Sequence, residues 1–224
     1  MLNIKLFHFG ALQACCAVVW KDGAKGCAVI DPGMFYPEER PQLTDYIDAQ
    51  GLSVDAILLT HGHFDHFYGA GYLQKRTGAK VYIHPRDVVV ASHQMDSVAR
   101  LALKNHPYEP FEPTDVAEGD SISAGGISWK VLETPGHSPG GVAYIDDEDA
   151  LVFPGDTLFA GSIGRTDLED GDYDILMDSL LHKILTLPDE YEVIPGHGPS
   201  TTIGAEALTN PFLQPFNEPL AQED

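Results

Sequence analysis

The feature that most constrains this chain is a group of four potential metal ligands within six consecutive residues, His61-Gly62-His63-Phe64-Asp65-His66. The group directly follows Asp55–Thr60, a short apolar run that predicts a buried strand. On an extended segment the first two histidines project to the same side of the strand, and a turn into a helix would carry the other two donors to a neighbouring position. Since α/β proteins place their chemistry at strand ends, the motif predicts a metal centre there, with donors for two ions.

Four donors in one segment cannot complete two coordination spheres, so this prediction requires further ligands at other strand ends. The sequence supplies three, each directly after a glycine and close behind a predicted strand: His137 after Ile127–Leu132, Asp156 after Ala150–Phe153, and His197 after Tyr191–Ile194. Glycine allows the backbone to turn sharply and to approach an ion closely. Taken singly, each donor has an ordinary interpretation as a turn or cap residue. Seven donors in matching positions favour one shared metal centre.

The spacing of apolar residues predicts an alternating order of strands and helices. The first half begins with a meander of three strands and continues as helix, strand, helix and strand, and the second half starts a new sheet. We therefore predict an α/β (α+β) fold of two packed sheets flanked by helices, with one domain over 1–210 and a flexible tail over 211–224. The predicted strands are Ile4–Phe9, Cys16–Trp20, Cys27–Ile30, Asp55–Thr60, Ala79–Ile83, Ile127–Leu132, Gly141–Ile145, Ala150–Phe153 and Tyr191–Ile194, and the predicted helices are Pro37–Gln50, Tyr68–Thr77, Asp87–Lys104 and Tyr173–Leu187.

The charge balance limits the partners that we expect. The formal net charge is -21, from 13 Lys and Arg against 34 Asp and Glu, and this field repels nucleic acid and anionic membranes. The chain has no basic leader and no apolar run approaching ~18 residues, so we expect a cytoplasmic protein. Three cysteines, two of them adjacent, imply no disulfide framework and are expected to be buried thiols. The oligomeric state stays open.

The order of the donors resembles that of the metallo-β-lactamase superfamily. The series begins at Asp31 in Val29-Ile30-Asp31-Pro32-Gly33, continues through the four-donor motif, and ends at His197. The segment from Gly155-Asp156-Thr157-Leu158-Phe159 to Gly164-Arg165-Thr166-Asp167 is similar, more narrowly, to the glyoxalase II (hydroxyacylglutathione hydrolase) branch. The resemblance implies a four-layer αβ/βα sandwich of two mixed sheets, with the metals at one edge of both sheets.

The resemblance also implies a role for each donor. The first of two divalent metal ions would be held by His61, His63 and His137, the second by Asp65, His66 and His197, with Asp156 bridging both. Asp31 would orient the loop of the first motif, although Asp-Pro-Gly is also a common turn. We expect zinc, with iron or manganese as alternatives. Two such ions lower the pKa of a shared water from about 15.7 toward 7, so that hydroxide attacks an acyl carbonyl, with Asp65 as a subsidiary proton acceptor.

Arg165 is the candidate for substrate recognition, because glyoxalase II enzymes contact glutathione with a basic residue in this loop. An internal pair between Arg165 and Asp167 is an equally good interpretation, and aromatic residues stand in those enzymes where Thr166 and Asp167 stand here. The short stretch after His197 does not provide the C-terminal helical domain that supplies much of their glutathione site. Any glutathione pocket in this chain is therefore expected to be shallower or built differently.

The motifs are compatible with several reactions on a small-molecule substrate. We expect hydrolysis of a thioester such as S-lactoylglutathione, or of other small esters or lactones. The alternative is persulfide dioxygenase, which shares the ligand motifs but uses a single iron. That family has a cysteine before Gly-Arg-Thr-Asp, whereas Ile163 stands here, and this difference favours hydrolysis. β-Lactamase activity is a weaker interpretation, and the acidic charge disfavours a nuclease.

Overall fold

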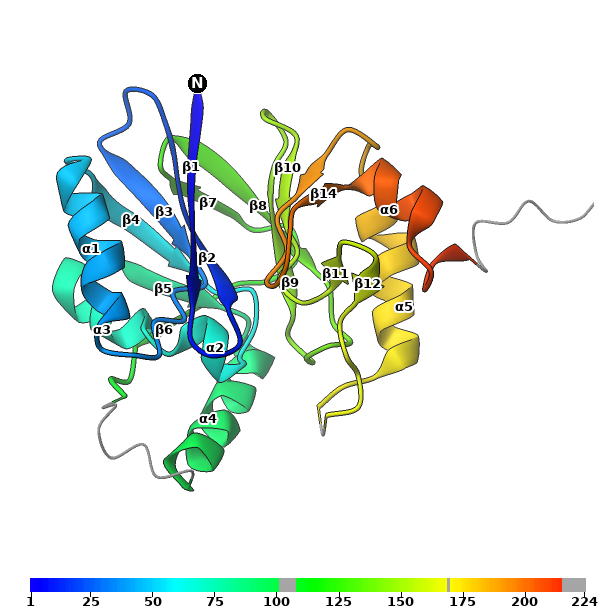
Figure 1. The fold of residues 1–224 in the computed structure, drawn as a ribbon, viewed down its shortest axis with the longest axis horizontal. Helices are drawn as coiled ribbons and strands as arrows, with labels where there is room; N and C mark the ends of the chain where they lie inside the picture. The colour runs from blue at the N-terminus through cyan, green and yellow to red at the C-terminus, as the bar shows by residue number, and fades with distance from the viewer. Residues whose placement is uncertain (101–107, 169, 215–224) are drawn as a thin grey trace, which may run out of the picture.

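In the computed structural model, which describes residues 1–100, 108–168 and 170–214, the N-terminal half of the chain builds a six-stranded mixed sheet (Figure 1). Its first three strands form the predicted antiparallel meander, and the remaining three run parallel to the third. Parallel neighbours need crossover connections, which are mostly helical here. In order across the sheet, the strands are β1 (Leu2–Phe9), β2 (Ala14–Lys21), β3 (Gly26–Ile30), β4 (Ser53–Leu58), β5 (Lys80–Ile83) and β6 (Pro113–Asp115).

The C-terminal half builds a second six-stranded mixed sheet and a separate small hairpin. The sheet has the order β14-β13-β10-β9-β8-β7, in which only β10 and β13 pair in parallel. Its strands are β7 (Ser121–Ala124), β8 (Ile127–Glu133), β9 (Val142–Asp146), β10 (Leu151–Phe153), β13 (Glu192–Val193) and β14 (Thr201–Thr202), and the hairpin consists of β11 (Leu158–Phe159) and β12 (Ser162–Ile163).

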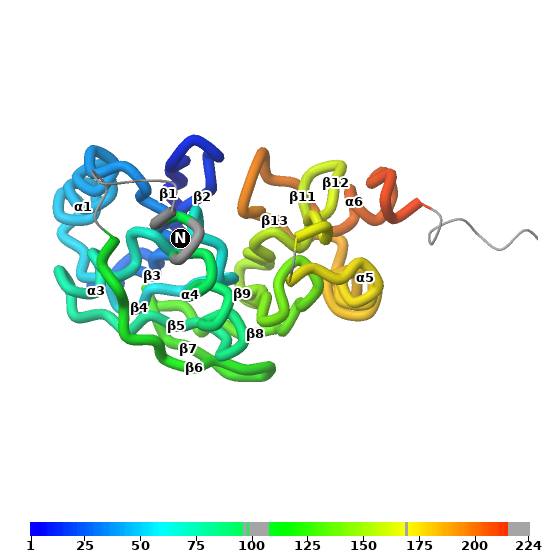
Figure 2. Tube along the Cα trace, turned by 90° about the horizontal axis from the view of Figure 1, so that it is seen from below, coloured from blue at the N-terminus to red at the C-terminus, as the bar shows by residue number. Residues whose placement is uncertain are grey.

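Helices cover the outer face of each sheet, with α1 and α3 on one flank and α5 and α6 on the opposite flank (Figure 2). Asp172 caps α5, because its Oδ1 accepts a hydrogen bond from the backbone N–H of Ile175. The helices are α1 (Glu39–Ala49), α2 (Phe64–Phe67), α3 (Ala70–Thr77), α4 (Pro85–Arg100), α5 (Tyr173–His182), the 3-10 turn η1 (Ile184–Thr186) and α6 (Ile203–Thr209).

One predicted helix ends earlier in the structure, and another is described only in part. The helix predicted over Tyr173–Leu187 stops at His182, and a 3-10 turn follows it. Leu187 is extended, with φ -67° and ψ 149°, because the next residue is a proline and disfavours helical geometry before it. The helix predicted over Asp87–Lys104 is described as far as Arg100, and the rest of it lies outside the described residues.

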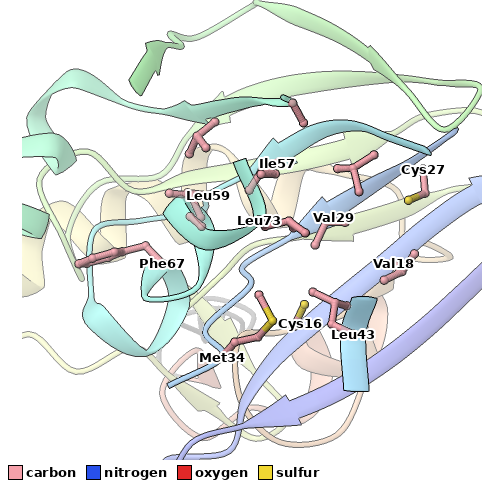
Figure 3. Close-up of a cluster of buried hydrophobic side chains, with 14 of the residues drawn as sticks. Cys16, Val18, Cys27, Val29, Met34, Leu43, Ile57, Leu59, Phe67 and Leu73 are labelled. Carbon is pink, nitrogen blue, oxygen red and sulfur yellow. The ribbon is translucent and has the colours of Figure 1, made fainter. Parts of the chain in front are cut away.

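Three apolar clusters separate the layers. The alternating side chains of β2 show the principle, since Cys16 and Val18 face the helical side while Ala17 and Val19 face the second sheet. Figure 3 shows the first cluster, in which Leu43 of α1 lies among the side chains of this face. The second cluster fills the space between the two sheets, and the third lies between the second sheet and α5.

This helix–sheet–sheet–helix order confirms the predicted four-layer sandwich. The predicted tail began at Pro211, yet Leu213 is fully buried in the third cluster, and residues 215–224 lie outside the described part. No helix among the described residues is both long and apolar enough to cross a membrane.

Candidate metal centre

The first group of donors combines two residues of the motif with one from the second sheet. His61 and His63 follow β4, and His63 keeps extended geometry at the residue before α2. His137 lies in the turn between β8 and β9, and its Nε2 is 2.9 Å from Nδ1 of His63. All three side chains are buried, and their donor atoms lie within 4.8 Å of one another. They form a three-histidine cluster of the kind that holds a divalent transition metal.

The second group lies beside the first and unites Asp65, His66 and His197. The Nε2 atoms of the two histidines are 3.2 Å apart, and Oδ2 of Asp65 is 3.3 Å from Nε2 of His197. The helical turn of α2 carries Asp65 and His66 away from the first group, as the sequence predicted, and the turn after β13 supplies His197. The groups thus draw on both sheets at one edge of the sandwich.

Asp156 lies between the two groups. Its Oδ1 is 3.4 Å from Nε2 of His66, and its Oδ2 is 3.5 Å from Nε2 of both His137 and His197. The glycine before His197 makes this approach possible: a Cβ at Gly196 would overlap Oδ1 of Asp156. The structure therefore brings all seven predicted donors together, and Asp156 occupies the position expected of a bridging ligand.

Asp31 lies beneath the cluster and contacts the loop of the first motif. Its carboxylate accepts hydrogen bonds from the backbone N–H of Thr60 at 2.8 Å, from the Thr60 hydroxyl at 2.6 Å, and from Nδ1 of His66 at 3.0 Å. Its φ of 47° is unusual for a residue other than glycine, and such backbone conformations gather at functional sites. This geometry agrees with the orienting role that the resemblance implied.

Four of the five cluster histidines use their outer ring nitrogen to bond the protein. Because the Thr60 hydroxyl gives its proton to Asp31, its oxygen accepts from Nδ1 of His61. The outer nitrogens of His137 and His197 donate to backbone carbonyls, of Arg165 at 2.8 Å and of Leu12 at 3.1 Å, and His66 donates to Asp31. Such contacts fix the ring orientation and the tautomer of a metal ligand, leaving the inner nitrogen for the ion.

The donor atoms fit a metal ion in a further respect. His61 Nε2 and Asp156 Oδ1 are buried and have no hydrogen-bond partner among the described residues. Buried polar atoms in proteins almost always have a partner, so these two atoms point to a cation as their partner. A set of imidazoles and carboxylates suits zinc, iron or manganese.

The pKa values of His61 and His63 in the first group of donors and of His66 in the second shift in opposite directions. Burial, together with the charges of neighbouring histidines, lowers the pKa of His63 to about 3 and that of His61 far below its usual range. Burial also acts to lower the pKa of His66, but the carboxylates of Asp156 and Asp65 outweigh burial and raise it to about 10. Without metal, His61 and His63 are neutral at pH 7, whereas His66 carries a proton that a metal must displace.

These shifts predict that the metal-free protein is most stable near pH 6.5. The raised pKa of His66 contributes stability that is fully present below the unfolded value of about 6.5 and is lost as the pH rises toward about 10. The lowered pKa of His63 contributes stability that is present above about 6.5 and lost as the pH falls toward about 3. When chelator-treated protein is unfolded by heat between pH 5 and 8.5, the midpoint temperature should therefore be highest near pH 6.5 and decrease both below and above it.

Two controls isolate this effect. Metal-loaded protein should lose little stability between pH 6.5 and 8.5, since an ion replaces the proton on His66, and the exposed control His182→Gln should behave like wild type. The pH range ends near 8.5, where cysteines of the unfolded chain begin to ionise. Burial raises the pKa of Cys15 and Cys27 to about 12 in the folded protein, so at higher pH these thiols would also lower the stability and obscure the effect of His66. A midpoint of metal-free protein that rises steadily from pH 6.5 to 8.5 would contradict the prediction.

The sequence analysis missed Asp87, a fully buried carboxylate in the first turn of α4. Its Oδ2 accepts from the backbone N–H of Gly62 and from the Ser138 hydroxyl, both at 2.7 Å, and its Oδ1 accepts from the backbone N–H of Gly140 at 2.6 Å. Gly62 separates His61 from His63, and Ser138 follows His137. Asp87 thus ties together the two loops that carry the first group of donors.

A pocket of ≈ 540 Å³ opens over the cluster. His63, Asp65, His137, Asp156 and His197 lie in its wall, and its apolar lining comes from Leu12, Phe64, Phe159, Ile163 and Leu168. Arg165 also lines it, but the Arg165 side chain makes two hydrogen bonds to the carboxylate of Asp167, at 2.7 and 2.9 Å. The internal pair, one of the two interpretations of Arg165, is therefore present.

This chain is similar in sequence to a known protein family and to a curated protein. Residues 9–197 match the sequence model of a family described as the metallo-beta-lactamase superfamily. Hydroxyacylglutathione hydrolase GloC of Haemophilus influenzae is 36% identical to this chain over 215 residues, which cover 95% of this chain and 98% of that protein.

Two solved structures are similar over nearly the whole chain. TTHA1623 in a di-iron-bound form superposes with a TM-score of 0.81 at 40% identity, covering 93% of this chain and 100% of that one. The BLEG-1 B3 metallo-beta-lactamase has a TM-score of 0.79 at 35% identity, covering 94% of this chain and 99% of that one.

Proposed function

The chain belongs to the metallo-β-lactamase superfamily, and on that basis we propose that it is a metal-dependent hydrolase of small thioesters such as S-lactoylglutathione. The observation that carries the proposal is the seven-donor cluster at the base of an open pocket, with the outer nitrogens of its histidines held by the protein. An accessible cluster suits catalysis, whereas a structural metal site is closed. The similarity to GloC supports a thioester as the substrate class.

Each donor has a proposed place in the metal site. The first ion would be held by His61, His63 and His137, the second by Asp65, His66 and His197, with Asp156 in contact with both. The ions would lower the pKa of bound water toward about 7 and polarise the thioester carbonyl. Zinc, iron and manganese all fit these nitrogen and oxygen donors.

The chain's own residues position the substrate and handle the proton. Burial acts to raise the pKa of Asp65, but the charge of His66 and a hydrogen bond from His197 hold it well below its usual range. Asp65 is therefore ionised at neutral pH and lines the pocket, where its carboxylate is the proposed acceptor of the proton released by water. Asp31 keeps Thr60 and His66 in place.

The persulfide dioxygenase alternative requires a single iron and consumes oxygen. The similarity to TTHA1623, which was solved in a di-iron-bound form, favours two ions over one. The absence of a cysteine at position 163, where Ile163 stands, also favours hydrolysis.

The test is an assay of chelator-treated protein to which zinc, iron or manganese is returned. We expect metal-dependent release of glutathione from S-lactoylglutathione, with up to two ions bound per chain. One iron per chain with oxygen consumption on glutathione persulfide would overturn the hydrolase proposal. Turnover of a β-lactam with no turnover of any thioester would overturn the assignment of the substrate class.

A further inference from the structure

A second pocket, of ≈ 220 Å³, lies directly beside the metal cluster. It shares Leu12, Phe64 and Asp65 with the larger pocket, so the two meet at the donor Asp65. Apart from that carboxylate its lining side chains are aromatic or aliphatic: Phe9, Ala11, Leu12, Phe35, Tyr36 and Phe64, with Gly10 between them. The rings of Phe35 and Phe64 pack edge to face, with centroids 5.6 Å apart. We call this space the aromatic pocket.

Hydrogen bonds from residues outside the aromatic pocket fix the positions of its walls. The carboxylate of Glu39, which is only 9% exposed, accepts from the backbone N–H of Gly10 at 2.7 Å and from that of Tyr36 at 2.9 Å. One carboxylate thereby holds the turn between β1 and β2 on one side and Tyr36 on the other. The carbonyl of Leu12 accepts from His197. The shape of the aromatic pocket is therefore set before a ligand arrives, which lowers the entropic cost of binding.

We propose that the aromatic pocket receives the acyl group of the substrate, and that this group is a compact apolar one such as a phenylalkanoyl group. This inference rests on the proposed thioester hydrolysis. The acyl group is bonded directly to the carbonyl that must reach the cluster, so it lies within a few atoms of Asp65. The larger thiol portion is left to the larger pocket, where Gln94 and Arg165 offer polar contacts.

The size and chemistry of the aromatic pocket fit this assignment. An apolar cavity of about 150 Å³ is enough to hold benzene, and this one is larger. Aromatic pairs prefer the offset or edge-to-face contacts that the rings of Phe35 and Phe64 would offer to a phenyl group. Hydrolysis adds water to the thioester and yields a carboxylic acid and a thiol, with no further reactant.

The test compares thioesters of one thiol, glutathione, that carry acetyl, lactoyl and phenylacetyl groups. We expect kcat/KM for S-phenylacetylglutathione to exceed that for S-acetylglutathione by about 10- to 100-fold, the range in which apolar pockets distinguish added hydrocarbon. Ala11→Trp enlarges a residue that lines the aromatic pocket and should lower the ratio of kcat/KM for the phenylacetyl substrate to kcat/KM for the acetyl substrate toward one. Equal rates for the acetyl and phenylacetyl substrates in wild type would overturn the proposal.

Ala49→Trp is the matched control, because Ala49 is exposed at the end of α1 and does not line the pocket. It should keep the preference of wild type. If Ala11→Trp reduces turnover of all acyl groups equally, the aromatic pocket does not select the acyl group.

Binding of the acid products separates this inference from the proposed function. Calorimetry on the metal-loaded protein should show phenylacetate binding at least about tenfold more tightly than acetate, and Ala11→Trp should abolish the difference. If no thioester is hydrolysed but phenylacetate still binds more tightly, the proposed reaction fails while the aromatic pocket stands. If thioesters are hydrolysed and both acids bind equally, only the acyl assignment fails.

Discussion

Replacing Asp156 with alanine is expected to remove both metal binding and activity. Asp156 lies within 3.5 Å of donor nitrogens from both groups, and its buried Oδ1 has no other partner among the described residues. Without it, the inner nitrogens of His66, His137 and His197 lose the one carboxylate that contacts all three of them among the described residues. Metal ions contribute several kcal/mol of transition-state stabilisation, so we expect kcat/KM to fall by about 10³-fold or more.

Metal analysis after dialysis and thioester turnover at saturating metal are the measurements. Asp178→Ala is the control, since Asp178 is exposed on α5 and its carboxylate pairs with His182, away from the donor cluster. It should retain the metal content and the rate of wild type. An Asp156→Ala protein that keeps two ions per chain and full turnover would show that Asp156 does not bridge the site.

Asp87→Ala is expected to weaken metal binding, although Asp87 is not itself among the cluster donors. The substitution leaves two backbone N–H groups, of Gly62 and Gly140, and the Ser138 hydroxyl buried without an acceptor. Each such group costs about 1–3 kcal/mol, so the free energy of unfolding should fall by several kcal/mol. Because the loops of the first group lose their common anchor, we expect metal affinity to fall about 10- to 100-fold, as for other residues that support metal ligands.

Asp87→Asn separates a positioning role from a general loss of stability. The amide keeps the size of the carboxylate but offers one acceptor oxygen, so at least one of the three hydrogen bonds is lost. Chelator competition should show weakened metal binding, while saturating metal should restore kcat with little change in KM. Asp174→Asn, at an exposed residue of α5, is the control, because it also removes a negative charge from the first turn of a helix. If Asp87→Asn matches both wild type and Asp174→Asn in metal affinity, Asp87 has no positioning role.

The donors could be predicted from the sequence because each one stands in a local pattern. A buried strand, a glycine and then a histidine or aspartate can be recognised within a few residues. The continuous apolar run of β2 and the alternating pattern of β8 are each long enough to identify a strand. The supporting contacts lack such a pattern. Asp87 reaches Gly140 across 53 positions, and the carbonyls of Leu12 and Arg165 that orient two histidines have no side-chain signature at all.

The elements that the sequence did not predict are short or are held by tertiary contacts. β11, β12 and β14 contain two residues each, too few to show a period of two. The hairpin of β11 and β12 is kept in place by the buried side chains of Glu206 and Asn210, which bond Gly161 and Ser162. The direction of the Arg165 side chain depends on the loop conformation that brings the carboxylate of Asp167 to it, and the spacing of the two residues alone does not determine that conformation.

The hydrogen bond between His197 and the carbonyl of Leu12 joins positions 185 residues apart. During synthesis the motif from His61 to His66 leaves the ribosome long before His197 does, so an early chain can offer an ion only part of the second group. Contacts of such large sequence separation form late, because the entropy of closing the loop must be overcome first. The second group of donors is therefore complete only after the turn that carries His197 has met the turn between β1 and β2, so metal bound by both groups indicates that the two ends of the fold have come together.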